Sequence, residues 1–277
     1  MALSPNRYLK VLAVFLSLGG ASAQAQAPDG ECDAQCQANR DAQDPTAEVN
    51  ALFFDNTISF SDDRDETLYN FEIQGVRTLL SEDWGGLILR GIVPVLGVPV
   101  PDPPTFDLDT EWGISDTLIQ LFYVPDANIG PLSFGFGPQV SLETHSEDEL
   151  KGAGFGGGLA AGAFGFVGPW SVGGLANHLW GENEFSTTTL QPIVYYNFIN
   201  PEIGNWFLGY NAQITYDWSA ASADDAWSVP VGLSVGRTVL RPSGPAVSYV
   251  VGAYGLADSP NDAFDWQLKF AVNILSR

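Results

Sequence analysis

The chain has 277 residues, is 45% hydrophobic, and carries 33 acidic residues against 11 basic ones, a formal net charge of −22. So acidic a composition excludes nucleic acid as a partner, because contacts to phosphate need Lys and Arg. After the first twenty residues no apolar run is long enough for a membrane-spanning helix, which excludes helical inner-membrane proteins.

The N-terminus has the organisation of a secretory signal peptide. Arg7 and Lys10 precede the apolar stretch VLAVFLSLGG, and the small residues Ala21-Ser22-Ala23 follow it. We predict cleavage after Ala23 or Ala25, assign residues 1–23 to the signal, and expect no lipoprotein anchor. Without Arg7 and Lys10, 9 basic residues remain against 33 acidic ones, a net charge of −24.

Residues 24–49 are polar and rich in Ala, Gln and Asp. We interpret them as a periplasmic leader with one short helix, with insertion into a barrel lumen as the alternative. Cys32 and Cys36 are the only cysteines, and in an exported chain two such neighbours favour a disulfide. Intermolecular pairing is one alternative and a metal site the other, but a zinc site would need further ligands, and His145 and His178 lie far along the chain. We predict no metal and no cofactor.

From Asn50 onward the chain alternates between segments of about ten residues and polar connections. We predict twelve strands, at 50–60, 67–79, 86–97, 113–124, 131–143, 152–166, 169–180, 187–199, 205–218, 227–239, 246–256 and 265–275. An even number of strands is typical of bacterial outer-membrane barrels. The predicted fold is therefore all-β, a transmembrane antiparallel up-and-down barrel over residues 50–277.

The connections fall into two alternating sets. The longer, acidic set is 61–66, 100–112, 144–151, 181–186, 219–226 and 257–264, and the shorter set is 81–85, 125–130, 167–168, 200–205 and 240–245. Long loops outside and short turns in the periplasm are usual for such barrels. We interpret the acidic set as solvated loops, because no EF-hand spacing occurs in it. Loose binding of divalent cations is the alternative.

The stretch NWFLGYNAQITYDW, residues 205–218, shows the strand pattern most clearly. Apolar side chains recur at every second position from Trp206 to Trp218, and after Phe207 the intervening residues are polar or small. Twelve steps at about 3.3 Å give roughly 40 Å, or about 30 Å along the membrane normal for a strand tilted by about 40°. This predicts a continuous strand with one lipid-facing and one lumen-facing side.

The eight tryptophans lie at strand ends, which predicts two aromatic girdles at the membrane interfaces. Those beside the short turns are Trp84, Trp170 and Trp206, and those beside the acidic loops are Trp112, Trp180, Trp218, Trp227 and Trp266. A secreted soluble sandwich is the alternative, but it would be expected to bury a tryptophan in mid-strand.

Strand parity places polar residues on the lumen side, where they would line a substrate path. These candidates are Asn70, Glu72, Gln74, Arg90, Gln191, Asn211, Gln213, Asp217, Gln267 and Lys269. Glu72 with Arg90, or Asp217 with Lys269, are the ion pairs we consider. The alternative is that these groups only fill the interior of a closed barrel.

Several segments resemble a bacterial family of outer-membrane proteins. They include LYNFEIQGV (68–76), SEDWGGLILRGIVPV (81–95), WSVGGLANHLWG (170–181), TYDWSA (215–220) and WQLKFAVNIL (266–275). The family is labelled transporter or meta-pathway phenol-degradation protein, and is sometimes misnamed neuromedin U. The resemblance implies a β-barrel and passage of small aromatic or hydrophobic compounds. Such chains commonly end near an aromatic residue, whereas this one ends Ile274-Leu275-Ser276-Arg277.

The function we expect is passive transport of small molecules across the outer membrane of a Gram-negative bacterium, without enzymatic activity. Expected partners are outer-membrane lipid and lipopolysaccharide, the barrel assembly machinery and a small-molecule solute, and a homo-oligomer is left open. One alternative is a closed structural barrel. The other is an outer-membrane lipase or phospholipase, for which His178 is the only reasonable base and no nucleophilic serine can be identified. Residues 152–157 match GxGxxG, but without the strand-to-helix context of a dinucleotide site.

Overall fold

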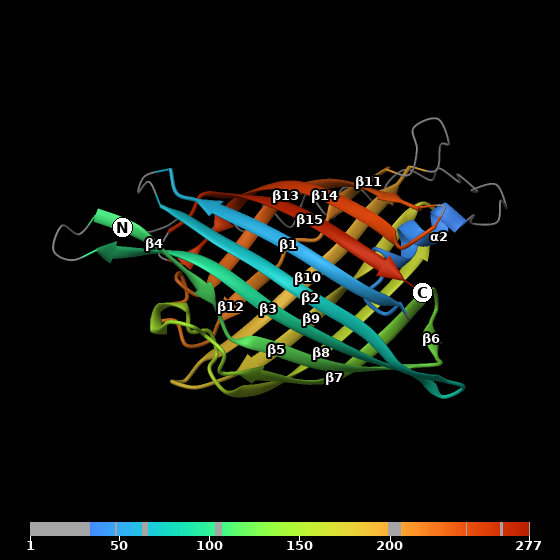
Figure 1. The fold of residues 1–277 in the computed structure, drawn as a ribbon, viewed down its shortest axis with the longest axis horizontal. Coiled ribbons are helices and arrows are strands. Elements are labelled where there is room, and N and C mark those ends of the chain that lie inside the picture. Colours follow the sequence, from blue (N-terminus) through green and yellow to red (C-terminus); the bar gives the residue numbers. More distant parts are fainter. Residues whose placement is uncertain are drawn as a thin grey trace. The chain divides into compact units, whose positions relative to one another are not determined.

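The computed structural model describes residues 34–47, 49–62, 66–102, 107–198, 206–241, 243–260 and 263–276. In this part of the chain, most residues belong to one antiparallel sheet that closes into a barrel of twelve strands (Figure 1). The strands are β1 (Asn50–Phe60), β2 (Thr67–Glu82), β3 (Gly85–Asp102), β5 (Thr117–Pro125), β7 (Leu132–Leu142), β8 (Gly156–Val167), β9 (Trp170–Trp180), β10 (Ser186–Asn197), β11 (Trp206–Tyr210) continued by β12 (Ile214–Asp217), β13 (Trp227–Val239), β14 (Ala246–Asp258) and β15 (Trp266–Ser276).

Each barrel strand pairs with the next one in the chain, and the first strand pairs with the last. The closing register runs from Asn50 opposite Ser276 to Phe60 opposite Trp266. Four short elements complete the described structure, namely helix α2 (Ala34–Asp41), the 3-10 turn η1 (Asp148–Leu150), β4 (Asp107–Ile114), which pairs with β3, and β6 (Asn128–Ile129), which pairs with β7. Among the described residues, no helix is both long enough and apolar enough to cross a membrane.

The predicted period of two is visible in the exposure of the strands. Along β14, Ser248, Val250 and Tyr254 are buried, while Tyr249 and Val251 between them are nearly half exposed. Alternate residues of a strand point to opposite faces of the sheet, so one row faces the interior and the other faces outward. The predicted fold class, a closed antiparallel barrel of twelve strands, is confirmed.

The prediction of one continuous strand over 205–218 is wrong. β11 ends at Tyr210 and β12 begins at Ile214, and the same register continues on both sides of the gap. That register places Pro192 of β10 beside Ala212 and Pro230 of β13 beside Gln213. Proline has no N–H to donate, so both neighbouring strands offer fewer ladder bonds at this point.

Other predicted boundaries also shift, and two of the shifts have a common cause. The strand predicted at 113–124 is divided at Ser115 and Asp116 between β4 and β5, and the one predicted at 152–166 begins only at Gly156. The cause is the side chain of Asp116, which accepts hydrogen bonds from the backbone N–H groups of Gly152 and Gly154. Those amides are therefore not available to a strand ladder.

The hydrophobic core lies inside the barrel rather than between layers. It consists of Phe164, Ile193, Tyr195, Phe207, Val250 and Ala271, all less than 10% exposed. A smaller cluster of Val49, Ala51 and Leu275 lies where the leader enters β1. Small barrels are filled by side chains in this way, and here the filling is concentrated toward one end.

Candidate functional site

The residues that the structure describes line an inner and an outer cavity inside the barrel. The inner cavity, of about 120 Å³, is lined partly by residues 42–49, and the outer cavity, of about 250 Å³, is lined partly by residues of the long loops. Arg90, Leu175 and Gln191 line both. These three side chains therefore mark the boundary between the two cavities.

Arg90 is held in place by glutamines from neighbouring strands. Its Nη2 donates to Gln74 Oε1 at 2.6 Å, and its Nη1 donates to Gln120 Oε1 at 3.3 Å. Gln74 Nε2 donates to a carboxylate oxygen of Glu72 at 2.6 Å, and Gln120 Nε2 donates to Gln139 at 2.7 Å. The network spans β2, β3, β5 and β7, so the guanidinium is fixed by several strands at once.

Two acids and two bases lie at this level. Besides Glu72 and Arg90, Lys269 Nζ lies 3.6 Å from Asp55 Oδ1, and their side chains are 9% and 25% exposed. Gln74 Nε2 also reaches Asp55 Oδ2 at 3.4 Å. With all four groups ionised, the formal charge of this layer is zero.

The ion pairs considered from the sequence do not form as such. Lys269 pairs with Asp55 instead of Asp217, and Asp217 accepts hydrogen bonds from Ser219. The sheet order explains this, because β13 and β14 separate β12 from β15, whereas β1 is the direct neighbour of β15. Arg90 donates to Gln74 and Gln120, and among the described residues no ion pair joins it to Glu72 within 4.0 Å.

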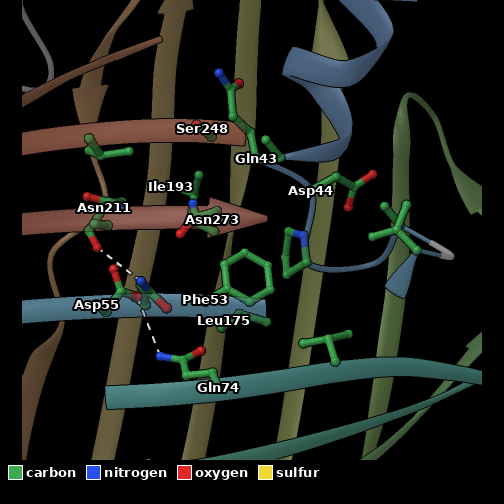
Figure 2. A pocket seen from close by; sticks show the side chains of 18 of the residues that line it. Gln43, Asp44, Phe53, Asp55, Gln74, Leu175, Ile193, Asn211, Ser248 and Asn273 are labelled. Atoms are coloured by element: carbon green, nitrogen blue, oxygen red, sulfur yellow. Dashed lines mark hydrogen bonds between the residues drawn. The ribbon is translucent and has the colours of Figure 1, made fainter. Parts of the chain in front are cut away.

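The inner cavity combines an apolar wall with unpaired polar atoms (Figure 2). Phe53, Leu175 and Ile193 supply apolar surface. Ser248 and Asn273, which are register partners on β14 and β15, also line it. Within the described part of the chain, Ser248 Oγ and Asn273 Oδ1 have no hydrogen-bond partner although both are buried. Such atoms need a ligand or water to satisfy them.

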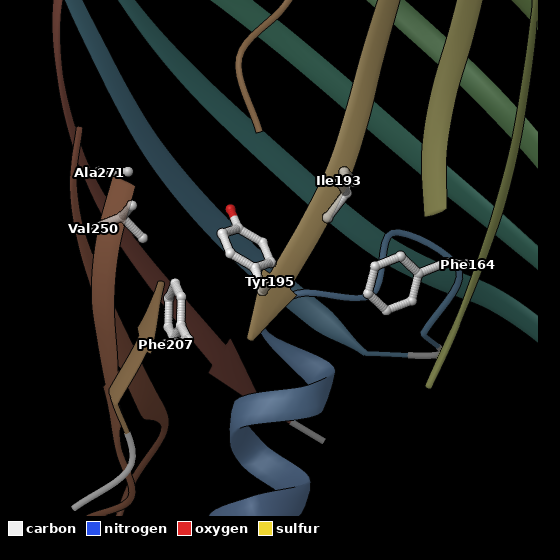
Figure 3. Close-up of a cluster of buried hydrophobic side chains, with 6 residues drawn as sticks. All are labelled: Phe164, Ile193, Tyr195, Phe207, Val250 and Ala271. Carbon is white, nitrogen blue, oxygen red and sulfur yellow. The ribbon is translucent and has the colours of Figure 1, made fainter. Parts of the chain in front are cut away.

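The leader occupies the end of the barrel where the short turns lie. Asn39 and Gln43 donate to Asn197 Oδ1 at 2.8 Å each, and Thr238 Oγ1 donates to Asn39 at 2.8 Å. Ser171 Oγ donates to Gln43 at 2.5 Å. Helix α2 lies beside the core residues Tyr195 and Phe207 (Figure 3). Within the described part of the leader, residues 34–47, these contacts correspond to the alternative arrangement, in which this segment lies inside the barrel end.

Further along the leader, Thr46 and Asp44 anchor the turn that leads to β1. Thr46 Oγ1 lies 2.6 Å from Ser133 Oγ of β7, and both its N–H and its hydroxyl donate to Asp44 Oδ1. Burial raises the pKa of Asp44 above its usual value, although the hydrogen bonds from Thr46 act against this. Ionisation of Asp44 therefore opposes docking of this segment.

At the opposite end, Asp116 folds a long loop over the mouth. Its carboxylate is 2% exposed and accepts from His145 Nδ1 at 2.8 Å, from the N–H groups of Thr144 and His145, and from those of Gly152 and Gly154 at 2.9 and 2.6 Å. Burial would raise the pKa of Asp116, but the hydrogen bonds outweigh it and the pKa lies below its usual value. Gly152 and Ala153 consequently line the outer cavity.

The same loop is joined to the following one by Lys151. Its Nζ lies 2.8 Å from Glu182 and 3.6 Å from Glu143. The hydrogen bond with Glu182 raises the pKa of Lys151 and lowers that of the glutamate. All three groups are partly exposed, so the direct energetic contribution of these pairs is small.

The structure places the predicted lumen residues as follows. Six of them line one or both cavities, namely Glu72, Gln74, Arg90, Gln191, Asn211 and Gln213. Of the other four, Asn70 donates a hydrogen bond to Glu72, and Lys269 pairs with Asp55. Asp217 and Gln267 lie nearer the long loops, and Gln267 is the register partner of Ser59 and Tyr254. The predicted disulfide involves Cys32, which lies outside the described residues.

The predicted girdle tryptophans are all exposed by 36% or more. Trp170 and Trp206 lie at the short-turn ends of their strands, and Trp84 lies in the turn between β2 and β3. Four others, Trp180, Trp218, Trp227 and Trp266, lie at or just beyond the long-loop ends. Trp112 lies on β4, in the hairpin that extends beyond the barrel wall, and its ring packs on Tyr69 at 4.9 Å.

Asp55, Gln120 and Gln139 are site residues that the predicted set of lumen residues does not contain. Each is a polar residue at an inward position of a largely apolar strand. Strand parity alone would have found all three, because a buried polar group on the lipid side is costly.

The comparisons with known proteins concern the fold. No protein family matches the chain, and no curated protein does. Among solved structures, the COG4313 outer membrane channel from Pseudomonas putida F1 is similar with a TM-score of 0.56 and 12% identity, over 82% of this chain and 94% of that one. The KdgM porin has a TM-score of 0.45 and 11% identity, over 82% and 98% of the two chains, and the outer membrane phospholipase A from Escherichia coli has 0.42 and 11%, over 84% and 97%. Because only 12% of the residues are identical, the similarity to the COG4313 channel shows a shared fold, that of an outer-membrane β-barrel.

Proposed function

We propose that the protein is a channel of the Gram-negative outer membrane that lets small, phenol-like solutes pass and is closed by its own leader in the arrangement described. The inner cavity carries this proposal. It offers an apolar wall and two unpaired buried oxygens, so it suits a molecule with an apolar ring and one hydroxyl. Cavities of roughly 150 Å³ can hold benzene, so the inner cavity is of the right order for one ring.

The polar layer above this cavity supports passage rather than storage. Arg90 and Gln191 border both cavities, so a solute leaving one would meet the same side chains on entering the other. With its four groups ionised the layer has no net formal charge, and it then favours neutral or dipolar solutes over ions. The resemblance of segments such as 170–181 to the phenol-degradation family agrees with this substrate class.

The test is the conductance of single refolded molecules in a planar bilayer, with and without phenol. We expect rare, small openings in the complete protein and frequent openings after deletion of residues 34–46. Phenol should reduce the open current, and Asn273→Leu should weaken this block because the hydroxyl loses its acceptor. A folded barrel that stays closed after the deletion would contradict the channel and favour the structural alternative.

A further inference from the structure

A serine and a histidine meet on the outer face of the barrel, away from the lumen. His178 of β9 lies directly opposite Thr188 of β10. Ser186 precedes Thr188 by two residues, so its side chain lies on the same face of β10. The imidazole Nδ1 is 2.7 Å from Thr188 Oγ1, and Nε2 is 3.4 Å from Ser186 Oγ. One imidazole thus lies between two hydroxyl groups at its two nitrogens.

The indole of Trp218 makes one imidazole tautomer favourable. Its Nε1 donates to Thr188 Oγ1 at 2.8 Å and occupies one lone pair of that oxygen. The second lone pair can accept Nδ1–H of His178, which leaves Nε2 free to accept the hydroxyl proton of Ser186. Thr188 then has the orienting place that a carboxylate has in Ser-His-Asp triads.

An apolar groove of about 620 Å³ includes this histidine in its wall. Its walls come from β3, β5, β7, β8, β9 and β10, include Leu87, Leu121, Tyr123, Phe136 and Leu159, and reach His178 and Thr188. Phe136 and Leu159 are 50% and 62% exposed, so the groove lies open on the outer face. In a barrel embedded in a bilayer this face meets lipid, and an acyl chain is the molecule of matching shape and polarity.

We propose that Ser186, His178 and Thr188 form a site that hydrolyses the acyl ester of a membrane lipid whose chain lies in this groove. His178 Nε2 takes the proton of Ser186 Oγ as that oxygen bonds to the ester carbon. The ester C–O bond breaks, and the leaving alcohol takes the proton from Nε2. Water then gives a proton to Nε2 and its hydroxyl to the acyl carbon, the bond between Ser186 Oγ and that carbon breaks, Oγ takes the proton back from Nε2, and the fatty acid leaves.

The lipid we assign is a phospholipid with a zwitterionic headgroup. The loop that leads into Ser186 carries Glu182 and Glu184, and Lys151 pairs with only the first of them. Their charge disfavours the more heavily phosphorylated lipopolysaccharide and suits an ammonium group. This site supplies the serine that the lipase alternative lacked. A hydroxyl orients imidazole less strongly than a carboxylate, so we expect a slow enzyme.

Labelling of the serine is the direct test. Refolded protein in detergent is treated with a fluorophosphonate that bears a long alkyl chain, and the adduct is located by mass spectrometry. We expect it on Ser186, with labelling at least about 100-fold slower in His178→Gln because a general base contributes factors of about 10² to 10⁴. Absence of an adduct on Ser186, or equal labelling of His178→Gln, would overturn the proposal.

Hydrolysis of phosphatidylethanolamine in mixed micelles provides the second measurement. We expect release of fatty acid, loss of at least about 100-fold in Ser186→Ala, and no change in the matched control Ser222→Ala, which alters an exposed loop serine. Thr188→Val should lower kcat and Thr188→Ser restore it, which distinguishes a positioning role from simple packing. Each variant is checked for folding by the heat-dependent shift of the barrel on gels. Release unchanged in Ser186→Ala, or release only from lipopolysaccharide, would refute the assignment.

Discussion

Replacement of Asp116 by asparagine should release the loop that covers the mouth of the barrel. In the wild type, Oδ2 accepts the N–H groups of Gly152 and Gly154, and Oδ1 accepts those of Thr144 and His145 and the imidazole Nδ1. An amide nitrogen cannot accept, so whichever way the new side chain turns, at least two donors lose their partner.

The size of the effect follows from those lost bonds. A hydrogen bond to a charged group contributes about 1.5 to 3 kcal/mol, so two of them amount to at least about 3 kcal/mol. Since about 1.4 kcal/mol corresponds to a factor of ten, the loop should open on the order of 100-fold more often. The lowered pKa of Asp116 adds a pH dependence. Its stabilisation is present above the ordinary aspartate pKa and is lost as the pH falls through the lowered value.

Hydrogen exchange of peptides covering residues 143–155 measures this opening. The Asp116→Asn variant should lose protection at Gly152 and Gly154 by about two orders of magnitude, and trypsin should cut faster after Lys151. Glu149→Gln, which changes an exposed carboxylate of the same loop, is the matched control. Equal protection in the wild type and Asp116→Asn would refute the reasoning that this carboxylate holds the loop.

Three further changes test other parts of the barrel. Asp44→Asn should strengthen leader docking at neutral pH and remove its pH dependence. Because the pKa of Asp44 is raised, docking is most stable below the ordinary aspartate pKa and becomes weaker as the pH rises through the raised value. The frequency of channel opening between pH 4 and 8 measures this. Lys269→Met leaves Asp55 without its cation and should make the polar layer more negative. The reversal potential in a salt gradient should then show increased cation selectivity. An unchanged reversal potential would contradict the placement of this pair in the path. Gly137→Ala should destabilise the barrel by about 1 to 3 kcal/mol, because a Cβ would collide with the backbone oxygen of Leu121, and denaturant unfolding followed by tryptophan fluorescence would detect it.

Local pattern was sufficient to predict the strands. Alternating apolar residues define which face of β14 or β15 turns outward, and this property depends only on neighbours two residues apart in the chain. The boundaries at Asp116 and at Ala212 could not be predicted in this way. In the first case the competing hydrogen bonds come from residues almost forty positions later, and in the second the disturbing prolines lie on neighbouring strands.

The candidate sites depend on register, which the sequence does not encode locally. Parity placed Arg90 and Lys269 on the lumen side, but only the pairing of β1 with both β2 and β15 brings Asp55 to Lys269. The same holds on the outer face, where pairing of β9 with β10 brings Ser186 to His178.

The sequence by itself therefore determined the all-β class, the number of strands and the inward or outward sense of their side chains, because these follow from periodicity along one segment. Only the tertiary structure decided the partners of the charged groups, the docking of the leader through Asn39 and Gln43, and the contact between Ser186 and His178. Each of these joins residues that are far apart in the chain or on different strands, and a shift of one residue in strand pairing would separate the contacts made between strands.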